Sequence, residues 1–115
     1  MNKLILTGNP YSTNNIYFST AKIGFRIMSS KARERKKQYQ EEAIAQWRKG
    51  ILKDDIEISI KLFFGDKRKR DWDNYHKLSM DALTGIVWED DSQIKKATVL
   101  VGYCKENPRI EVEIN

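Results

Sequence analysis

The segment from Asp55 to Phe64 constrains the fold of this 115-residue chain more than any other. Every even position from 56 to 64 is apolar, and alternation with a period of two is typical of a β-strand that has one face on a core. Similar apolar patterns predict further strands, some of them irregular, at residues 3–7, 16–18, 23–28, 96–103 and 109–114. We expect the last two of these segments to pair as a hairpin.

Two segments have helical spacing instead. The first runs from an N-cap at Ser29 or Ser30 to about residue 48. The second begins at Asp73, which can cap it, and stops at Gly85. The chain length suits a single domain, residues 1–115. The predicted fold is α+β, a small mixed or antiparallel sheet with two helices packed on one face.

The composition limits where the protein works and what it binds. Apolar residues make up 40% of the chain, and no apolar run approaches the roughly 20 residues of a membrane-spanning helix. The single cysteine, Cys104, excludes an internal disulfide and argues against a zinc cluster. We therefore expect a cytoplasmic protein without a membrane partner. The net charge of +5 favours an anionic partner such as nucleic acid.

The residues with the most chemistry follow the clearest strand directly. Four cations occupy positions 67–70, and they attract a polyanion. Asp71 and Asp73 come next, and side chains two apart in an extended segment point the same way, which suits shared binding of a hard divalent metal. A third carboxylate can come from the acidic cluster at 89–91, and Lys77 can contact a phosphate oxygen. Together they suggest a metal site that acts on phosphates.

Each of these residues also has a purely structural interpretation, which the spacing leaves open. Asp73 can serve only as a helix N-cap, or pair with Lys77 four residues later. A run of cations is commonly a solvated surface. His76 stands without a general-base arrangement and is expected to be a surface or helix-packing residue. Trp72 and Trp88 are expected to be packing residues, with stacking of Trp72 on an exposed base as the alternative.

Several motifs, taken in order, resemble one known family. Residues 68–74 are Arg-Lys-Arg-Asp-Trp-Asp-Asn, Lys77 follows, residues 81–83 are Asp-Ala-Leu, and residues 90–94 are Asp-Asp-Ser-Gln-Ile. This order resembles the RusA family of Holliday junction resolvases, which has a basic run, D-x-D-N, a lysine one turn later, D-A-L and D-D-x-Q-[IV]. Residues 10–17 look like the proline-led loop of that family, with one proline missing and one residue inserted.

The resemblance implies a RusA-like fold and a homodimeric, Mg²⁺-dependent endonuclease, with Mn²⁺ as a substitute and no small-molecule cofactor. Such an enzyme resolves four-way DNA junctions by paired symmetric nicks. By position, the resemblance makes Asp71, Asp73 and Asp91 the metal-binding catalytic aspartates and Lys77 the essential lysine, with Asp90 as an alternative to Asp91. The remaining implied roles are DNA contacts by Asn14, Asn15, Lys67, Arg68, Lys69 and Arg70, and support of the metal ligands by Asn74 and Asp90.

Two other functions fit the same residues. A protein that binds junction or duplex DNA without catalysis would use its acids only to balance the basic loop. A general Mg²⁺ nuclease would cut linear duplex as readily as junctions.

Overall fold

The computed structural model of the protein describes residues 2–12, 17–19 and 26–115. It contains strands, helices and two short 3-10 turns, η2 and η3. Their bounds are β1 Lys3–Thr7, β2 Tyr17–Ser19, β3 Arg26–Met28, α1 Ser30–Gln46, β4 Ile56–Phe64, η2 Trp72–Asn74, α2 Lys77–Leu83, η3 Asp91–Gln93, β5 Ile94–Tyr103 and β6 Arg109–Ile114.

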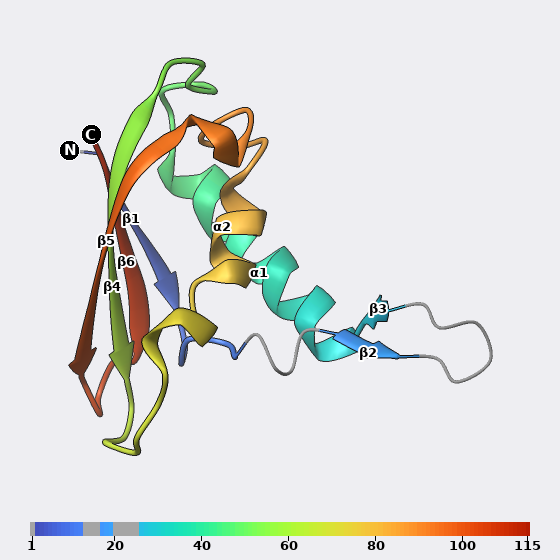
Figure 1. The fold of residues 1–115 in the computed structure, drawn as a ribbon, viewed down its shortest axis with the longest axis vertical. Coiled ribbons are helices and arrows are strands. Elements are labelled where there is room, and N and C mark those ends of the chain that lie inside the picture. Colours follow the sequence, from blue (N-terminus) through green and yellow to red (C-terminus); the bar gives the residue numbers. More distant parts are fainter. Residues whose placement is uncertain (1, 13–16, 20–25) are drawn as a thin grey trace.

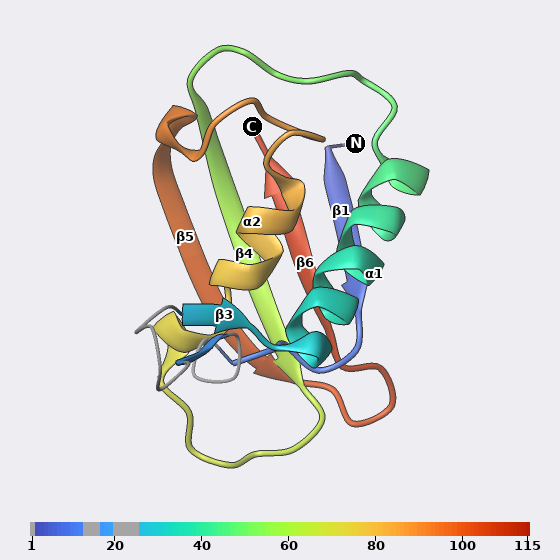
Figure 2. The ribbon, with the colours of Figure 1, turned by 90° about the vertical axis from the view of Figure 1, so that its right-hand side faces the viewer.

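A four-stranded mixed sheet is the base of the molecule, and both helices cover the same face of it (Figure 1). The strand order is β1-β6-β4-β5, in which β4 and β5 are parallel and the other neighbours are antiparallel. In Figure 2, α2 lies in front of β4, and α1 lies on the β1 side of the sheet. The predicted α+β architecture is therefore confirmed.

The expected hairpin between the last two strands is wrong. β5 and β6 lie on opposite sides of β4, so that they do not pair with each other. The connection at 104–108 passes the end of β4, where the Cys104 N–H donates to the Phe64 carbonyl at 2.9 Å. Pairing with β4 satisfies the backbone groups along both edges of that strand, which a β5–β6 hairpin would leave open.

The first helix begins where the sequence predicts. Ser29 is its N-cap, and the Ser29 Oγ accepts a hydrogen bond from the Ala32 N–H at 3.2 Å. Tyr39 and Ala43 are buried against the sheet, whereas Ile44 is 63% exposed. α1 therefore packs on the core through a narrow apolar face.

The second helix begins later than predicted, at Lys77. Asp73 lies in the η2 turn and does not cap α2. Tyr75 interrupts the helical path, because its ring packs edge-on against Phe64 with the centroids 4.9 Å apart. Trp88 beyond the helix is fully buried, as predicted, and its Nε1 donates to Thr84 Oγ1 at 2.9 Å.

The predicted irregular strand pair near the N-terminus is present in the described part of that segment. β2 and β3 form a separate antiparallel two-stranded sheet, in which Tyr17 pairs with Met28. Residues 20–25 lie outside the described residues. Figure 1 shows this small sheet beyond the N-terminal end of α1.

One buried acid, Glu111, links the neighbouring strands β1 and β6. Glu111 on β6 is 6% exposed and pairs with Lys3 at 2.8 Å and with Arg109 at 2.7 Å. Burial acts to raise the pKa of the Glu111 carboxyl, but the hydrogen bonds from Lys3 and Arg109 outweigh it and hold that pKa below its usual value. This carboxylate therefore stabilises the fold in its charged form. Among the described residues, none of the helices has the length and apolarity needed to cross a membrane.

Candidate active site

A cavity of about 710 Å³ opens between α2 and the β4–β5 half of the sheet. Its apolar walls come from both strands and from the underside of the helix, and include Ile58, Ile60, Met80, Ile94 and Val99. Polar or aromatic side chains from η2, α2, η3 and the residue before α2 also line it, namely Trp72, Asp73, His76, Lys77, Asp81 and Asp91. Three of the four predicted catalytic residues therefore share one cavity.

The fourth predicted catalytic residue, Asp71, lies apart from them. Asp71 lines a neighbouring cavity of about 350 Å³ together with Lys69 and Arg70. The chain from Trp72 to Asn74 curls into a 3-10 turn, closed by the Asn74 N–H donating to the Asp71 carbonyl at 3.1 Å. The expectation that Asp71 and Asp73 point the same way required an extended segment, and the turn removes that alternation.

Lys77 is held by an acid that the sequence interpretation did not assign to the site. Its Nζ lies 3.3 Å from Asp81 Oδ2, one helical turn further along α2. Both side chains are partly exposed, at 48% for Lys77 and 32% for Asp81. The i,i+4 spacing was the available signal for this pair, and the structure places Asp81 in the cavity beside Lys77.

The adjacent residues Asp90 and Asp91 have different surroundings. The Asp90 side chain caps η3, accepting from the Ser92 N–H at 3.3 Å, and the Gln93 side chain completes a capping box. The hydrogen bonds from Ser92 hold the pKa of the Asp90 carboxyl below its usual value. Both residues are exposed, but only Asp91 lines the cavity. Asp91 is therefore the acid of this pair that faces the other candidate residues.

His76 and Trp72 form part of the cavity wall, whereas the sequence favoured a surface or helix-packing role for His76 and a packing role for Trp72. Trp72 is 56% exposed, so it is not a core residue. Its ring stacks on His76 with the centroids 6.2 Å apart and the planes 17° apart. The His76 Nδ1 is buried and has no hydrogen-bond partner among the described residues. No sequence signal indicated that this histidine would line the cavity.

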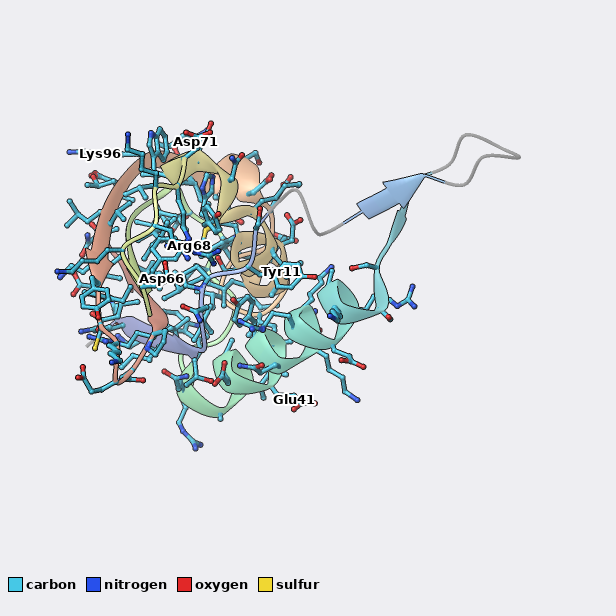
Figure 3. All side chains as sticks on the ribbon, turned by 90° about the horizontal axis from the view of Figure 1, so that it is seen from below. Tyr11, Glu41, Asp66, Arg68, Asp71 and Lys96 are labelled. Atoms are coloured by element: carbon cyan, nitrogen blue, oxygen red, sulfur yellow. The ribbon has the colours of Figure 1, made fainter. Side chains whose placement is uncertain are left out.

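The basic loop at 66–70 is organised by its own acid. Asp66 Oδ1 accepts from the Arg68 N–H at 3.0 Å and lies 2.8 Å from Arg70 Nη2. The backbone hydrogen bond from Arg68 is the main cause that holds the pKa of Asp66 below its usual value. Figure 3 looks along this end of the molecule and shows Asp66 and Arg68 next to each other, with Asp71 further away. Asp66 therefore shapes the loop that carries the predicted DNA contacts.

The other predicted DNA contacts and supporting residues are more scattered. Lys67 places its Nζ 5.0 Å from the centre of the Tyr103 ring, and Lys69 is exposed. Asn74 is half-buried in η2 and does not line the main cavity. Asn14 and Asn15 lie outside the described residues.

The donor chemistry of the cavity suits a hard divalent cation. Mg²⁺ in proteins is usually held by one or two carboxylates, with water and substrate phosphate in its other positions. Asp73 and Asp91 are exposed carboxylates that face one cavity, so they fit that pattern. No three Asp, Glu, His or Cys side chains gather around a metal position within residues 2–12, 17–19 and 26–115. Asp71 lines the neighbouring cavity and not this one.

One known protein family matches almost the entire chain. None of the curated proteins matches it. A family model described as Endodeoxyribonuclease RusA matches residues 7–115. The matched region includes the basic loop, both helices and every candidate site residue. The chain therefore belongs to the RusA endodeoxyribonuclease family.

Proposed function

We propose that this protein is a structure-selective, Mg²⁺-dependent endonuclease that resolves four-way DNA junctions by hydrolysing one phosphodiester bond in each of two strands. The observation that carries the proposal is the convergence of Asp73, Lys77 and Asp91, from three separate elements, in one cavity beside a basic loop. Membership of the RusA endodeoxyribonuclease family supports nuclease activity and a junction substrate.

Asp73 and Asp91 would hold the metal, and Asp71 would approach them from the adjacent cavity. When bound, Mg²⁺ supplies Lewis acidity at the phosphate and lowers the pKa of a coordinated water. Lys77 would neutralise charge that develops on the phosphate, and its contact with Asp81 keeps the ammonium at the cavity before DNA arrives. The exposed Trp72 ring offers a surface on which a sugar or base of the strand can lie.

The proposal includes a homodimer, because paired nicks across a junction need two sites that are most simply related by a two-fold axis. The exposed edge of β5 supports a second copy as the partner. Leu100 is 53% exposed and Val101 57% exposed, and residues 97–103 contain no charged side chain. Edge strands of monomeric proteins are usually protected by charge, proline or a bulge. Pairing along β5 would also bring the partner close to the main cavity, which Val99 lines.

The proposal is tested by replacing one carboxylate of the cavity. Asp73→Asn should lower the rate of junction nicking in Mg²⁺ by at least about 100-fold, while junction binding is retained, because the change removes a charge needed only for chemistry. The measurement is single-turnover cleavage of a synthetic four-way junction, with a fork and a linear duplex as comparison substrates. Asp55→Asn is the matched control, since Asp55 is exposed and does not line the cavity.

Three outcomes would contradict parts of the proposal. Cleavage by Asp73→Asn at the wild-type rate would remove Asp73 from the mechanism. A wild-type protein that binds the junction but never nicks it, in Mg²⁺ or Mn²⁺, would be a binding protein without catalysis. Equal cleavage of linear duplex and junction would indicate a general nuclease.

A further inference from the structure

A third cavity, of about 250 Å³, is lined by the same segment that carries the candidate active site, and we call it the arginine cavity. Arg70 and Tyr75 line the arginine cavity, whereas Asp73 and Lys77 line the main cavity. Its charged lining residues come from the basic loop and from α1, and are Arg35, Asp66, Arg68 and Arg70. The two cavities are therefore neighbours that share one short stretch of chain.

The charges of the arginine cavity favour an anion. It contains three guanidinium groups and one carboxylate. Asp66 is shared by two of the arginines, lying 3.4 Å from Arg68 Nε and 2.8 Å from Arg70 Nη2. Among the described residues, no carboxylate forms an ion pair with Arg35. An anion in this cavity would supply Arg35 with a counter-charge.

Arg35 is positioned before any ligand arrives. Its Nη1 donates to the Asn9 carbonyl at 2.6 Å and to the Tyr39 hydroxyl at 3.3 Å. Its guanidinium carbon lies 5.8 Å from the centre of the Tyr11 ring and 5.7 Å from that of Tyr39. Because these contacts already restrict the side chain, an anion would bind it at a smaller entropic cost.

The neighbouring backbone leaves room for this arrangement. Gly8 has a φ of +92°, and a Cβ at that position would lie 3.1 Å from Arg35 Nη1. The side chain of Asn9 also accepts from the Gly65 N–H at 2.8 Å, at the end of β4. Asn9 therefore ties α1 and the start of the basic loop to each other, and these are the two sides of the cavity. In Figure 3 the labelled Tyr11 lies between Arg68 and the ribbon of α1.

We infer that this cavity binds a backbone phosphate of the DNA strand being cut, at a nucleotide near the scissile one, with Arg35 as its principal positioned contact. Planar guanidinium groups bind phosphate oxygens in pairs, and phosphate contacts set the register of a protein on DNA. Arg35 is thus a positioning residue for the scissile phosphate. The inference rests on the proposed function, since it takes DNA as the ligand.

The test compares two substitutions on α1 that remove the same charge. Arg35→Gln removes one of the three cations of the cavity, and Lys37→Gln is the matched control, because Lys37 is exposed and does not line the cavity. Binding of a labelled four-way junction is measured in EDTA at several salt concentrations. Arg35→Gln should weaken binding about 10-fold and reduce the slope of log Kd against log salt by about 0.9, as expected for one phosphate contact. Lys37→Gln should weaken binding by no more than about 2-fold.

A double substitution shows whether two arginines contact the same group. The fold-loss of junction affinity in the double variant Arg35→Gln/Arg68→Gln should be smaller than the product of the fold-losses in the two single variants. In the double variant Lys37→Gln/Arg68→Gln it should equal that product. If thermal unfolding shows that Arg35→Gln disturbs the fold, Arg35→Lys replaces it. That variant keeps the charge without the planar group and should still bind several-fold more weakly than the wild type.

The results separate this inference from the proposed function. Equal binding losses for Arg35→Gln and Lys37→Gln, with junction nicking intact, would overturn the phosphate site and leave the nuclease. A loss specific to Arg35 in a protein that never nicks would support the phosphate site and overturn the nuclease. A wild-type protein that does not bind the junction would overturn both.

Discussion

Single side chains decide which acids can act together in this protein. Asp90 and Asp91 are adjacent, yet one caps a 3-10 turn while the other lines the main cavity. Asp71 and Asp73 are two residues apart, yet a turn directs them into different cavities. Adjacent acids in a sequence are therefore a poor guide to a shared ligand set unless the local backbone is known.

The two members of the Asp90–Asp91 pair should respond differently to substitution. Asp91→Asn should reduce junction nicking by at least about 100-fold with an unchanged melting temperature, because the side chain is exposed and faces the cavity. Asp90→Ala should lower the melting temperature by a few degrees, because η3 loses its cap. Cleavage kinetics and thermal unfolding of both variants check this. A reversed pattern would make Asp90 the metal ligand.

The family and the candidate site residues were predicted from the order of motifs along the sequence, and little was predicted of the geometry of the site. The motifs from Arg68 to Ile94 were sufficient for the family, which the match to residues 7–115 confirms. The metal ligand set stays a prediction. The sequence did not indicate that His76 would line the cavity, since a lone histidine has no spacing pattern. It favoured a packed Trp72 over an exposed one, since aromatic residues are usually buried.

At the scale of elements, the short segment before β5 is held by one glutamine. The buried Gln93 side chain donates to the Leu52 carbonyl at 2.9 Å and to the Asp54 carbonyl at 2.8 Å. Its oxygen accepts from the Glu89 and Asp90 N–H groups, both at 2.8 Å. These bonds connect the acidic segment to the chain before β4, so they position the element that carries Asp91.

Removing this glutamine should therefore affect both stability and activity. Gln93→Leu should destabilise the fold by about 3 kcal/mol, because four backbone groups lose their buried partner. It should also lower cleavage measured well below the melting temperature, because η3 loses its position. Ser92→Ala is the control at an exposed neighbouring residue and should change neither quantity much. Denaturant unfolding, recorded with complete folded and unfolded baselines, gives the free energies of unfolding. An unchanged stability would show that water replaces the side chain.

The elements themselves were mostly predictable, and the errors have physical causes. β1, β4, β6 and the start of α1 agree with the apolar periodicity and the Ser29 cap. The start of α2 was predicted too early, because the ring of Tyr75 packs on Phe64 and interrupts the helix. That contact joins residues from different elements, so local spacing contains no sign of it.

At the scale of the whole molecule, the sheet has one protected edge and one open edge. The Gln46 side chain hydrogen-bonds the N–H and the carbonyl of Ile5 on β1, at 2.8 and 2.7 Å. β5 at the opposite edge exposes apolar side chains over a stretch without charge. The sequence predicted the layers, but not that β5 would be an edge strand, because the pairing order depends on long-range contacts.

The open edge gives a test of the proposed dimer. The wild type should have a molar mass in solution of about twice its 13.5 kDa, and Val101→Lys should shift it to the monomer by adding a charge to the β5 edge. Ile44→Lys is the matched control, since Ile44 is more exposed but lies on α1. Light scattering after size exclusion measures both. A monomeric wild type, or a dimeric Val101→Lys variant, would contradict pairing through β5.

The parallel pairing of β4 with β5 has a consequence for folding. Parallel neighbours need a long crossover, and here the crossover from residue 65 to 93 contains the basic loop, α2 and all the candidate catalytic residues. Pairing of β6 with β4 closes the longer segment from residue 65 to 108, but it does not by itself place β5 beside β4. The cavity needs β5, which supplies Ile94, Ala97 and Val99 to its wall. Pairing of β5 with β4 and assembly of the cavity are thus the same event, so a chain that has formed only its antiparallel strands has no site at which to cut DNA.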